Sequence, residues 1–94
     1  MELVPDLVHV YYNRGCTYAN LGAYPLALSD FDKELSLHPK LFNALHYKRA
    51  LTAFLEKNYI ESWYEAQVLD GAGEKVSSLL LKDLDQSLHK LSKQ

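Results

Sequence analysis

The side chains that could support catalysis or metal binding are few and scattered along the chain. The four histidines (His9, His38, His46 and His89) have no cysteine or carboxylate partner at the spacing that holds a metal ion. Cys16 follows His9 by seven residues, which on a helix is two turns or roughly 10 Å along the axis. That separation is too long for a thiolate–imidazole pair. We therefore expect no enzyme activity, no metal and no cofactor.

Composition and charge narrow the classes of function further. The 94 residues suffice for one domain, and 48% of them are hydrophobic. Ten basic and twelve acidic side chains give a net charge of −2 without a block of like charges, which argues against nucleic-acid binding. No apolar run approaches the ~18 residues of a membrane span. The single cysteine, and an N-terminus without the basic and apolar regions of a signal peptide, predict a reducing, cytoplasmic location.

Residues that start and stop helices divide the chain into five helical segments. The signals are a capping aspartate and a capping box at helix starts, glycines at helix ends, and prolines at or near helix boundaries. No alternating apolar pattern predicts a strand, so the expected fold class is all-α. The predicted helices cover residues 6–21, 25–38, 40–56, 58–70 and 74–92.

An internal repeat organises the first four of these helices. A shift of 35 residues brings Arg14-Gly15 onto Arg49-Ala50, Tyr24 onto Tyr59, and Ala27 onto Ser62. Small residues at two of these positions are what an antiparallel helix pair needs where its backbones cross closely. The chain is therefore predicted to form two helical hairpins, with the second repeating the first.

The first unit, residues 8–41, resembles a tetratricopeptide repeat, a helix–turn–helix unit of about 34 residues. Its small and aromatic landmarks and its terminal proline have the spacing of that family. The matching residues are Tyr11-Tyr12-Asn13-Arg14-Gly15, Tyr18, Leu21-Gly22-Ala23-Tyr24, Ala27-Leu28, Asp30-Phe31 and Leu35 to Pro39. The resemblance implies a right-handed α-solenoid fragment in one domain, 1–94. Its parts are a first repeat at 6–41, a second at 42–70 and a capping helix at 74–92.

Two positions depart from the family pattern. In the second unit, Ala66 stands where a large aromatic residue is usual, and Trp63, one turn earlier, is expected to fill that volume. In the first unit, Glu34 replaces a small buried residue. Two interpretations remain open for Glu34: exposure at a loosened helix end, or pairing with a base such as Arg49.

The resemblance also implies a concave groove, lined by the first helix of each hairpin, that binds a peptide segment or C-terminal tail of another protein. The residues expected to line it are His9, Tyr12, Asn13, Cys16, Tyr47, Lys48 and Leu51. Asn13 and Lys48 give a partial likeness to co-chaperone domains, which clamp the terminal carboxylates of a chaperone tail. Lys lacks the bidentate geometry of Arg, so this clamp would be incomplete. The alternative is that these are ordinary exposed helix residues.

The two ends of the chain offer a different interaction surface. The last predicted helix carries an apolar stripe, and the residues before His9 are apolar as well. The stripe either caps the second hairpin or joins a partner or a second copy of the chain as a homo-oligomer. The possible assembly residues are Leu3, Leu7, Leu81, Leu84, Leu88 and Leu91.

Overall fold

The computed structural model describes residues 9–92, with side chains through residue 90. This part of the chain forms α-helices and contains no strand, which confirms the all-α prediction. The last helix begins at Ser78 instead of Glu74, and the predicted start of the first helix at Asp6 lies outside the described residues. The helices are α2 (Val10–Asn20), α3 (Tyr24–Leu37), α4 (Phe42–Leu55), α5 (Tyr59–Gly71) and α6 (Ser78–Ser92).

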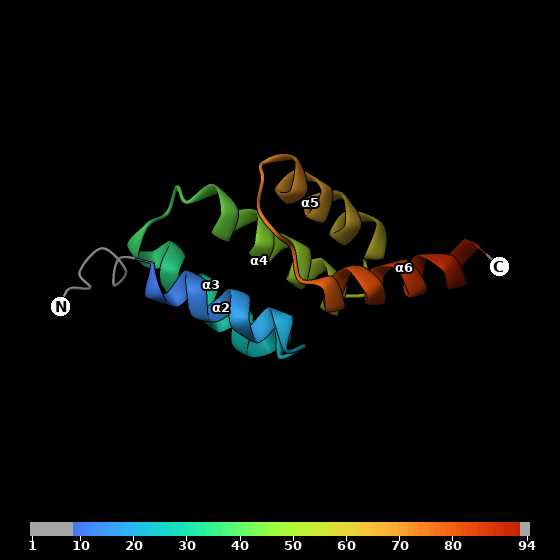
Figure 1. Ribbon diagram of the computed structural model, residues 1–94, viewed down its shortest axis with the longest axis horizontal. Helices are drawn as coiled ribbons and strands as arrows, with labels where there is room; N and C mark the ends of the chain where they lie inside the picture. The colour runs from blue at the N-terminus through green and yellow to red at the C-terminus, as the bar shows by residue number, and fades with distance from the viewer. Residues whose placement is uncertain (1–8, 93–94) are drawn as a thin grey trace.

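The first four helices form two hairpins that lie side by side (Figure 1). α2 pairs with α3 and α4 pairs with α5, while α3 contacts α4 and joins the hairpins. α6 packs against α5 and α2, and its C-terminal half projects beyond the hairpins. The molecule is elongated, 54 × 23 × 21 Å. This arrangement confirms the two hairpins predicted from the 35-residue repeat.

Small residues allow the two helices of each hairpin to approach closely. A Cβ atom added at Gly15 would lie 2.7 Å from Cε1 of Phe31, so the aromatic ring of α3 rests directly on the α2 backbone. In the second hairpin, Ser62 is fully buried and its Oγ donates a hydrogen bond to the Ala50 carbonyl at 2.7 Å. The predicted role of these positions in the helix crossings is confirmed.

Helices α2, α4 and α5 end with the same hydrogen-bonded turn. In each, the residue after the C-cap has a positive φ, and the next N–H donates to a carbonyl one turn back, as in a Schellman motif. Gly22 (φ 80°) and Gly73 (φ 87°) suit this conformation, whereas Lys57 (φ 64°) takes it with a side chain. The closing bonds run from Ala23 to Tyr18 (2.9 Å), from Asn58 to Ala53 (2.8 Å) and from Glu74 to Leu69 (3.0 Å).

One continuous apolar core runs through both hairpins and into the C-terminal region. Phe31 stacks on Tyr47, with ring centroids 5.0 Å apart, and links α3 to α4. Ala66 is fully buried in this core, but Trp63 is 46% exposed. The prediction that Trp63 fills the space beside Ala66 is therefore wrong, because nearly half of its surface is exposed to solvent. The core residues of the C-terminal region are Val76, Leu80 and Leu84.

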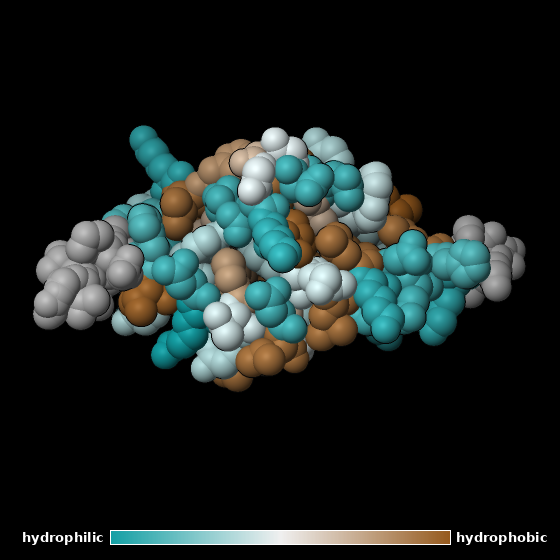
Figure 2. Space-filling model, viewed as in Figure 1, coloured by the Kyte–Doolittle hydropathy of each residue, from teal (hydrophilic) through white to brown (hydrophobic). Residues whose placement is uncertain are grey.

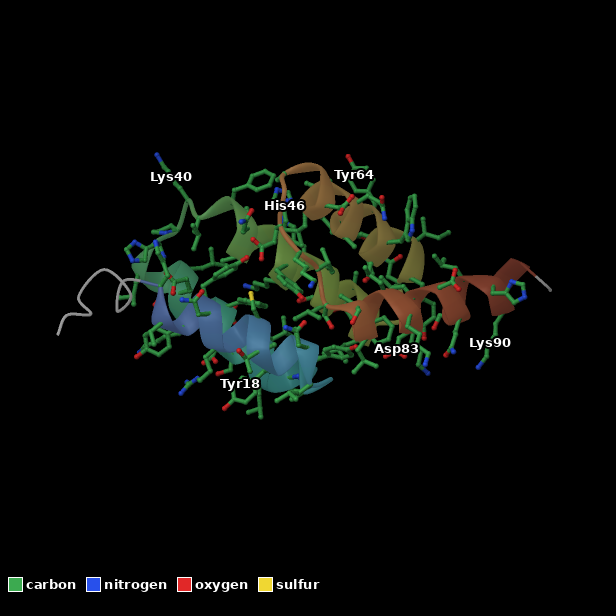
Figure 3. The ribbon with its side chains drawn as sticks, viewed as in Figure 1. Tyr18, Lys40, His46, Tyr64, Asp83 and Lys90 are labelled. Atoms are coloured by element: carbon green, nitrogen blue, oxygen red, sulfur yellow. The ribbon has the colours of Figure 1, made fainter. Side chains whose placement is uncertain are left out.

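A buried acid on the second helix of each hairpin is bound by a base from the first helix. Asp30 receives two hydrogen bonds of 2.8 Å from the Arg14 guanidinium, and these bonds raise the pKa of Arg14. Glu65, at the equivalent position 35 residues later, lies 2.6 Å from Nδ1 of His46. His46 is labelled in Figure 3. Such pairing satisfies carboxylates that would otherwise be costly to bury.

Candidate functional site

A short extended segment of the chain lies across the face that α2 and α4 present together. After α5 ends at the Gly73 turn, residues 74–77 run back over α4 toward α2 before α6 begins (Figure 1). We refer to Glu74–Ser77 as the crossing segment. It lies on the face of α2 and α4 where a peptide-binding groove was predicted, and the binding of a partner there stays a prediction.

Polar contacts fix the crossing segment at both of its ends. At its start, Nδ2 of Asn43 donates a hydrogen bond to Oε1 of Glu74 at 2.9 Å. At its end, the Ser77 N–H donates to the Tyr47 hydroxyl at 2.8 Å, and Oγ of Ser77 donates to the Ala19 carbonyl at 3.0 Å. The segment is therefore bound by both α4 and α2, through its backbone as well as its side chains.

Ser77 also begins α6. Its Oγ accepts a hydrogen bond from the Leu80 N–H at 3.3 Å, the interaction of an N-cap serine with the third residue of a helix. Leu80 and Leu84 then project into the core and are fully buried. Asp83 faces α3, where its Oδ2 accepts a hydrogen bond from the Tyr24 hydroxyl at 3.2 Å (Figure 3). α6 thus contacts the first hairpin in addition to α5, which it was predicted to cap.

The predicted groove residues fall into two groups. Tyr47 and Leu51 are fully buried in the core, and Tyr12 and Cys16 pack against it half-buried. The second group is more exposed to solvent. In this group, the Nζ of Lys48 pairs with Oδ1 of Asp32 on α3 at 2.7 Å.

The other two predicted residues are exposed. The Asn13 carbonyl accepts a hydrogen bond from Oγ1 of Thr17 at 3.2 Å, and His9 lies at the start of α2. Sequence reasoning missed Asn43 as a binding residue. Its position one turn before Tyr47 on the same face of α4 was the available signal.

The face formed by α2 and α4 buries polar groups in an apolar setting. Loss of hydration raises the pKa values of the Tyr12 and Tyr47 hydroxyls and raises that of the Cys16 thiol to about 11. Glu74 lies close enough to contribute to the shift at Tyr12. The buried Tyr12 hydroxyl nevertheless has no hydrogen bond of acceptable geometry with any described residue.

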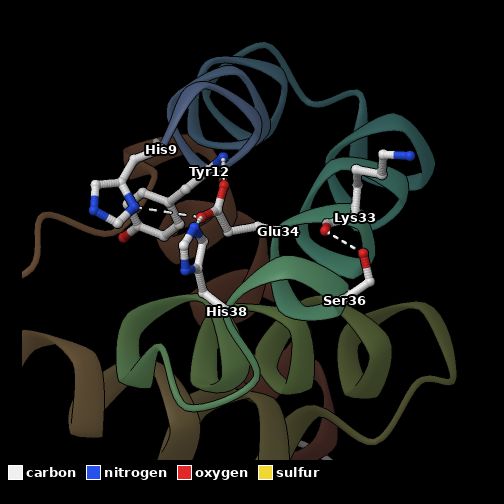
Figure 4. A network of polar contacts seen from close by, with 6 residues as sticks. All are labelled: His9, Tyr12, Lys33, Glu34, Ser36 and His38. Carbon is white, nitrogen blue, oxygen red and sulfur yellow. Dashed lines mark hydrogen bonds and ion pairs between the residues drawn. The ribbon is translucent and has the colours of Figure 1, made fainter. Parts of the chain in front are cut away.

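A buried carboxylate holds the beginning of α2 in place (Figure 4). Glu34 is fully buried, and its Oε1 accepts a hydrogen bond from the Tyr12 N–H at 3.0 Å. Its Oε2 lies 3.3 Å from Nδ1 of His9 and 3.8 Å from Nε2 of His38. Exposure of Glu34 is therefore wrong, and its pairing with a base is confirmed. The bases are two histidines instead of Arg49, which lies exposed on α4.

A pocket lies beside this carboxylate. It is open to solvent and has a volume of about 470 Å³. Its walls come from the start of α2 and from the connection between α3 and α4, so it is distinct from the contacts of the crossing segment. The lining residues are His9, Leu37, His38, Pro39, Lys40 and Leu41.

Exposed apolar side chains gather on the outer face of α5 and at the turn between α2 and α3. On α5, Ile60 is 70% exposed, Tyr64 62% and Trp63 46%. Tyr64 points away from the other helices (Figure 3). Leu21 and Leu26 lie at the turn, where the surface is hydrophobic, whereas the projecting end of α6 is largely hydrophilic (Figure 2).

The predicted assembly residues of α6 do not form one exposed stripe. Leu81 is exposed, Leu88 is half-buried and Leu84 is fully buried. Leu3, Leu7 and the side chain of Leu91 lie outside the described residues.

A comparison with known proteins supports the repeat interpretation. Over 85 residues, the chain is 32% identical to DNJ1, a tetratricopeptide repeat and J domain-containing co-chaperone of Cryptococcus neoformans. The match covers 85% of this chain but spans only 16% of the length of that relative. No protein-family profile and no solved structure matches the chain. Together with the two hairpins, the similarity points to helical repeats of tetratricopeptide type.

The described residues contain neither a membrane-spanning helix nor a cluster of metal ligands. Between residues 9 and 92, no helix is long and apolar enough to cross a membrane. Within the same range, no three His, Cys, Asp or Glu side chains are grouped so that they could hold a metal ion.

Proposed function

We propose that this chain is a non-catalytic protein-interaction module of tetratricopeptide type. Its concave face, formed by α2 and α4, binds an extended segment of a partner protein. The observation that carries this proposal is the crossing segment itself. A stretch of extended chain already lies on this face, with its backbone bound by Tyr47 and its Glu74 side chain bound by Asn43.

The chemistry of the face suits peptide recognition. A hydrogen bond to a peptide N–H contributes affinity whatever the sequence, whereas contacts with side chains select among sequences. The Tyr47 hydroxyl makes the first kind of contact, and the Asn43 amide makes the second. The buried hydroxyl of Tyr12 offers a further polar contact.

A role beside chaperones is the narrower form of the proposal. The relative is named as a co-chaperone, and the matched region covers most of this chain. Recognition of a chaperone tail by Asn13 and Lys48 has less support, because Lys48 is already paired with Asp32. We therefore place partner recognition at Asn43 and Tyr47.

Peptide selection followed by NMR mapping tests the proposal. Peptides selected from a random displayed library on the immobilised chain would be titrated into ¹⁵N-labelled protein. We expect the largest amide shifts around Tyr12, Cys16, Asn43 and Tyr47. Shifts confined to Ile60, Trp63 and Tyr64 would contradict the groove assignment.

A second candidate function is self-association through the outer face of α5. Exposed Ile60, Trp63 and Tyr64 form an apolar surface that lacks a cover within the described residues. Light scattering over a wide concentration range separates the candidates. A dimer that is lost in an Ile60→Ser, Tyr64→Ser variant would support assembly, whereas a constant mass near 10.8 kDa would exclude it.

A further inference from the structure

The C-terminal region that occupies the groove has a definite sequence pattern. An acidic residue, Glu74, is followed two positions later by Val76 and three positions later by Ser77. Leucines then follow Ser77 at three and seven positions, as Leu80 and Leu84. An extended stretch therefore leads through a serine N-cap into an amphipathic helix.

Each position of this pattern has a matching contact in the two hairpins. Glu74 is bound by Asn43, and Ser77 is bound by Tyr47 and by the Ala19 carbonyl. Three apolar positions enter the common core: Val76 is 6% exposed, and Leu80 and Leu84 are fully buried. The exposed residues between them, among them Lys75, Ser78 and Lys82, are free to vary.

A short, exposed connection joins this region to α5. Cβ atoms added at Gly71 or Gly73 would meet nothing within 4 Å, so the connection is not held by packing at these two points. Ala72, between the two glycines, is exposed. Release of residues 74–84 would break the hydrogen bond from the Glu74 N–H to the Leu69 carbonyl and withdraw Val76, Leu80 and Leu84 from the core. The contacts between α4 and α5 lie outside this segment.

The geometry points to the class of partner that the groove takes. We propose that the partner carries the pattern Glu-x-Val-Ser-x-x-Leu-x-x-x-Leu, or close chemical equivalents, and binds in place of residues 74–84. This inference rests on the proposed function of the concave face. It adds the sequence class of the ligand and the requirement that the chain's own segment be displaced.

Tethering makes the internal segment a strong competitor. A segment joined by a short flexible connection is present at an effective concentration of about 1 mM. A free peptide with the same contacts therefore binds the closed chain weakly, because its apparent affinity falls with the fraction of open groove. A substitution that weakens binding of the internal segment to the hairpins should raise the affinity of the chain for a free peptide of the same sequence.

Fluorescence anisotropy with a labelled peptide of residues 73–85 tests this prediction on the full chain. The receptors are the wild type and Val76→Asp, which places a charge in the apolar site of the internal segment. We expect the peptide to bind Val76→Asp at least tenfold more tightly than the wild type. Peptides carrying Val76→Asp or Glu74→Lys should bind that receptor at least tenfold more weakly than the parent peptide.

Circular dichroism must show that the Val76→Asp receptor keeps its helices. If it does not fold, Ser77→Gly serves as the receptor, because it removes the cap and the contact with Ala19 and leaves the apolar side chains unchanged. An Asn43→Ala change in the opened receptor should weaken binding of the parent peptide but not of its Glu74→Lys form.

Equal binding to the wild-type and opened receptors, or equal binding of the parent and altered peptides, would overturn the proposed pattern. Peptides selected from a random library separate this failure from failure of the proposed function. If selected peptides of another sequence bind at Asn43 and Tyr47, the groove function stands and the pattern is wrong. If no peptide binds the opened groove, both are wrong.

Discussion

The backbone N–H of Ser77 donates a hydrogen bond to the hydroxyl of Tyr47 at 2.8 Å, joining the start of α6 to the middle of α4. The two residues are 30 positions apart, and both are buried. Because the donor is a backbone group, the contact depends on the path of the crossing segment and not on its sequence. It holds the end of the crossing segment against α4.

Removal of the Tyr47 hydroxyl should destabilise the fold. Tyr47→Phe keeps the ring stacked on Phe31 but leaves the buried Ser77 N–H without its acceptor, at a cost of about 1–3 kcal/mol. Urea unfolding measures the change. Tyr64→Phe is the matched control, because Tyr64 is exposed, and should change stability by less than about 0.5 kcal/mol. Equal effects would show that the Ser77 contact contributes nothing.

A methyl group at Gly15 should disrupt the first hairpin. Gly15→Ala places Cβ 2.7 Å from the buried Phe31 ring, and the resulting overpacking should cost about 1–3 kcal/mol. Gly71→Ala, near the end of α5, meets nothing within 4 Å and should instead stabilise by up to about 1 kcal/mol. Thermal unfolding of the two variants gives the comparison. A Gly15→Ala protein as stable as the wild type would contradict the close crossing.

Glycine at position 57 should make the fold more stable than lysine does. Lys57 has a φ of 64°, a conformation that costs about 1–2 kcal/mol for a residue with a side chain. Lys57→Gly should therefore stabilise the chain by about 0.5–1 kcal/mol, after allowance for the flexibility of glycine in the unfolded state. The reverse test is Gly22→Ala, because Gly22 has a φ of 80° and alanine should destabilise the chain there. Urea unfolding of both variants measures the two changes in stability. Destabilisation by Lys57→Gly would refute this account of the turn.

Stability should decline in alkaline solution. Desolvation raises the pKa of Cys16 from 9.0 to about 11, and desolvation with the nearby Asp83 raises that of Tyr24 from 10.0 to about 12. The unfolded chain releases these protons first, so their stabilising contribution is complete below about pH 9 and is lost progressively up to about pH 12. Urea unfolding at several pH values should show this decline. A Cys16→Ala, Tyr24→Phe variant should show a smaller decline, and an identical one would rule out these two groups.

Local signals predicted the helices and the hairpins correctly. Gly22 and Pro39 mark helix boundaries through their own backbone preferences, and the small Gly15 and Ala27 indicate where two helices cross. These properties belong to single residues or to close neighbours in sequence. The hydrophobic periodicity of 74–92 likewise predicted a helix. Its start was placed four residues too early, because the Ser77 cap was not distinguished from the preceding residues.

The path of the crossing segment depended on contacts that no local pattern reveals. Ser77 meets Ala19 across 58 positions, and Asn43 meets Glu74 across 31. His9 was missed as a partner of Glu34 for a related reason. The two residues are 25 positions apart and meet only because the start of α2 packs against α3. Trp63 was misplaced because its size suggested burial, whereas the face of α5 that carries it points away from the core.

The central claim is that a partner binds the face of α2 and α4 that the crossing segment occupies. Hydrogen–deuterium exchange tests this claim most directly. Exchange would be followed in the full chain alone and saturated with a peptide selected for binding. If the peptide replaces the crossing segment, amides of residues 74–78 lose protection while those of α2 and α4 retain it. Unchanged protection at residues 74–78, with new protection on α5, would contradict groove binding and place the interaction on the outer face.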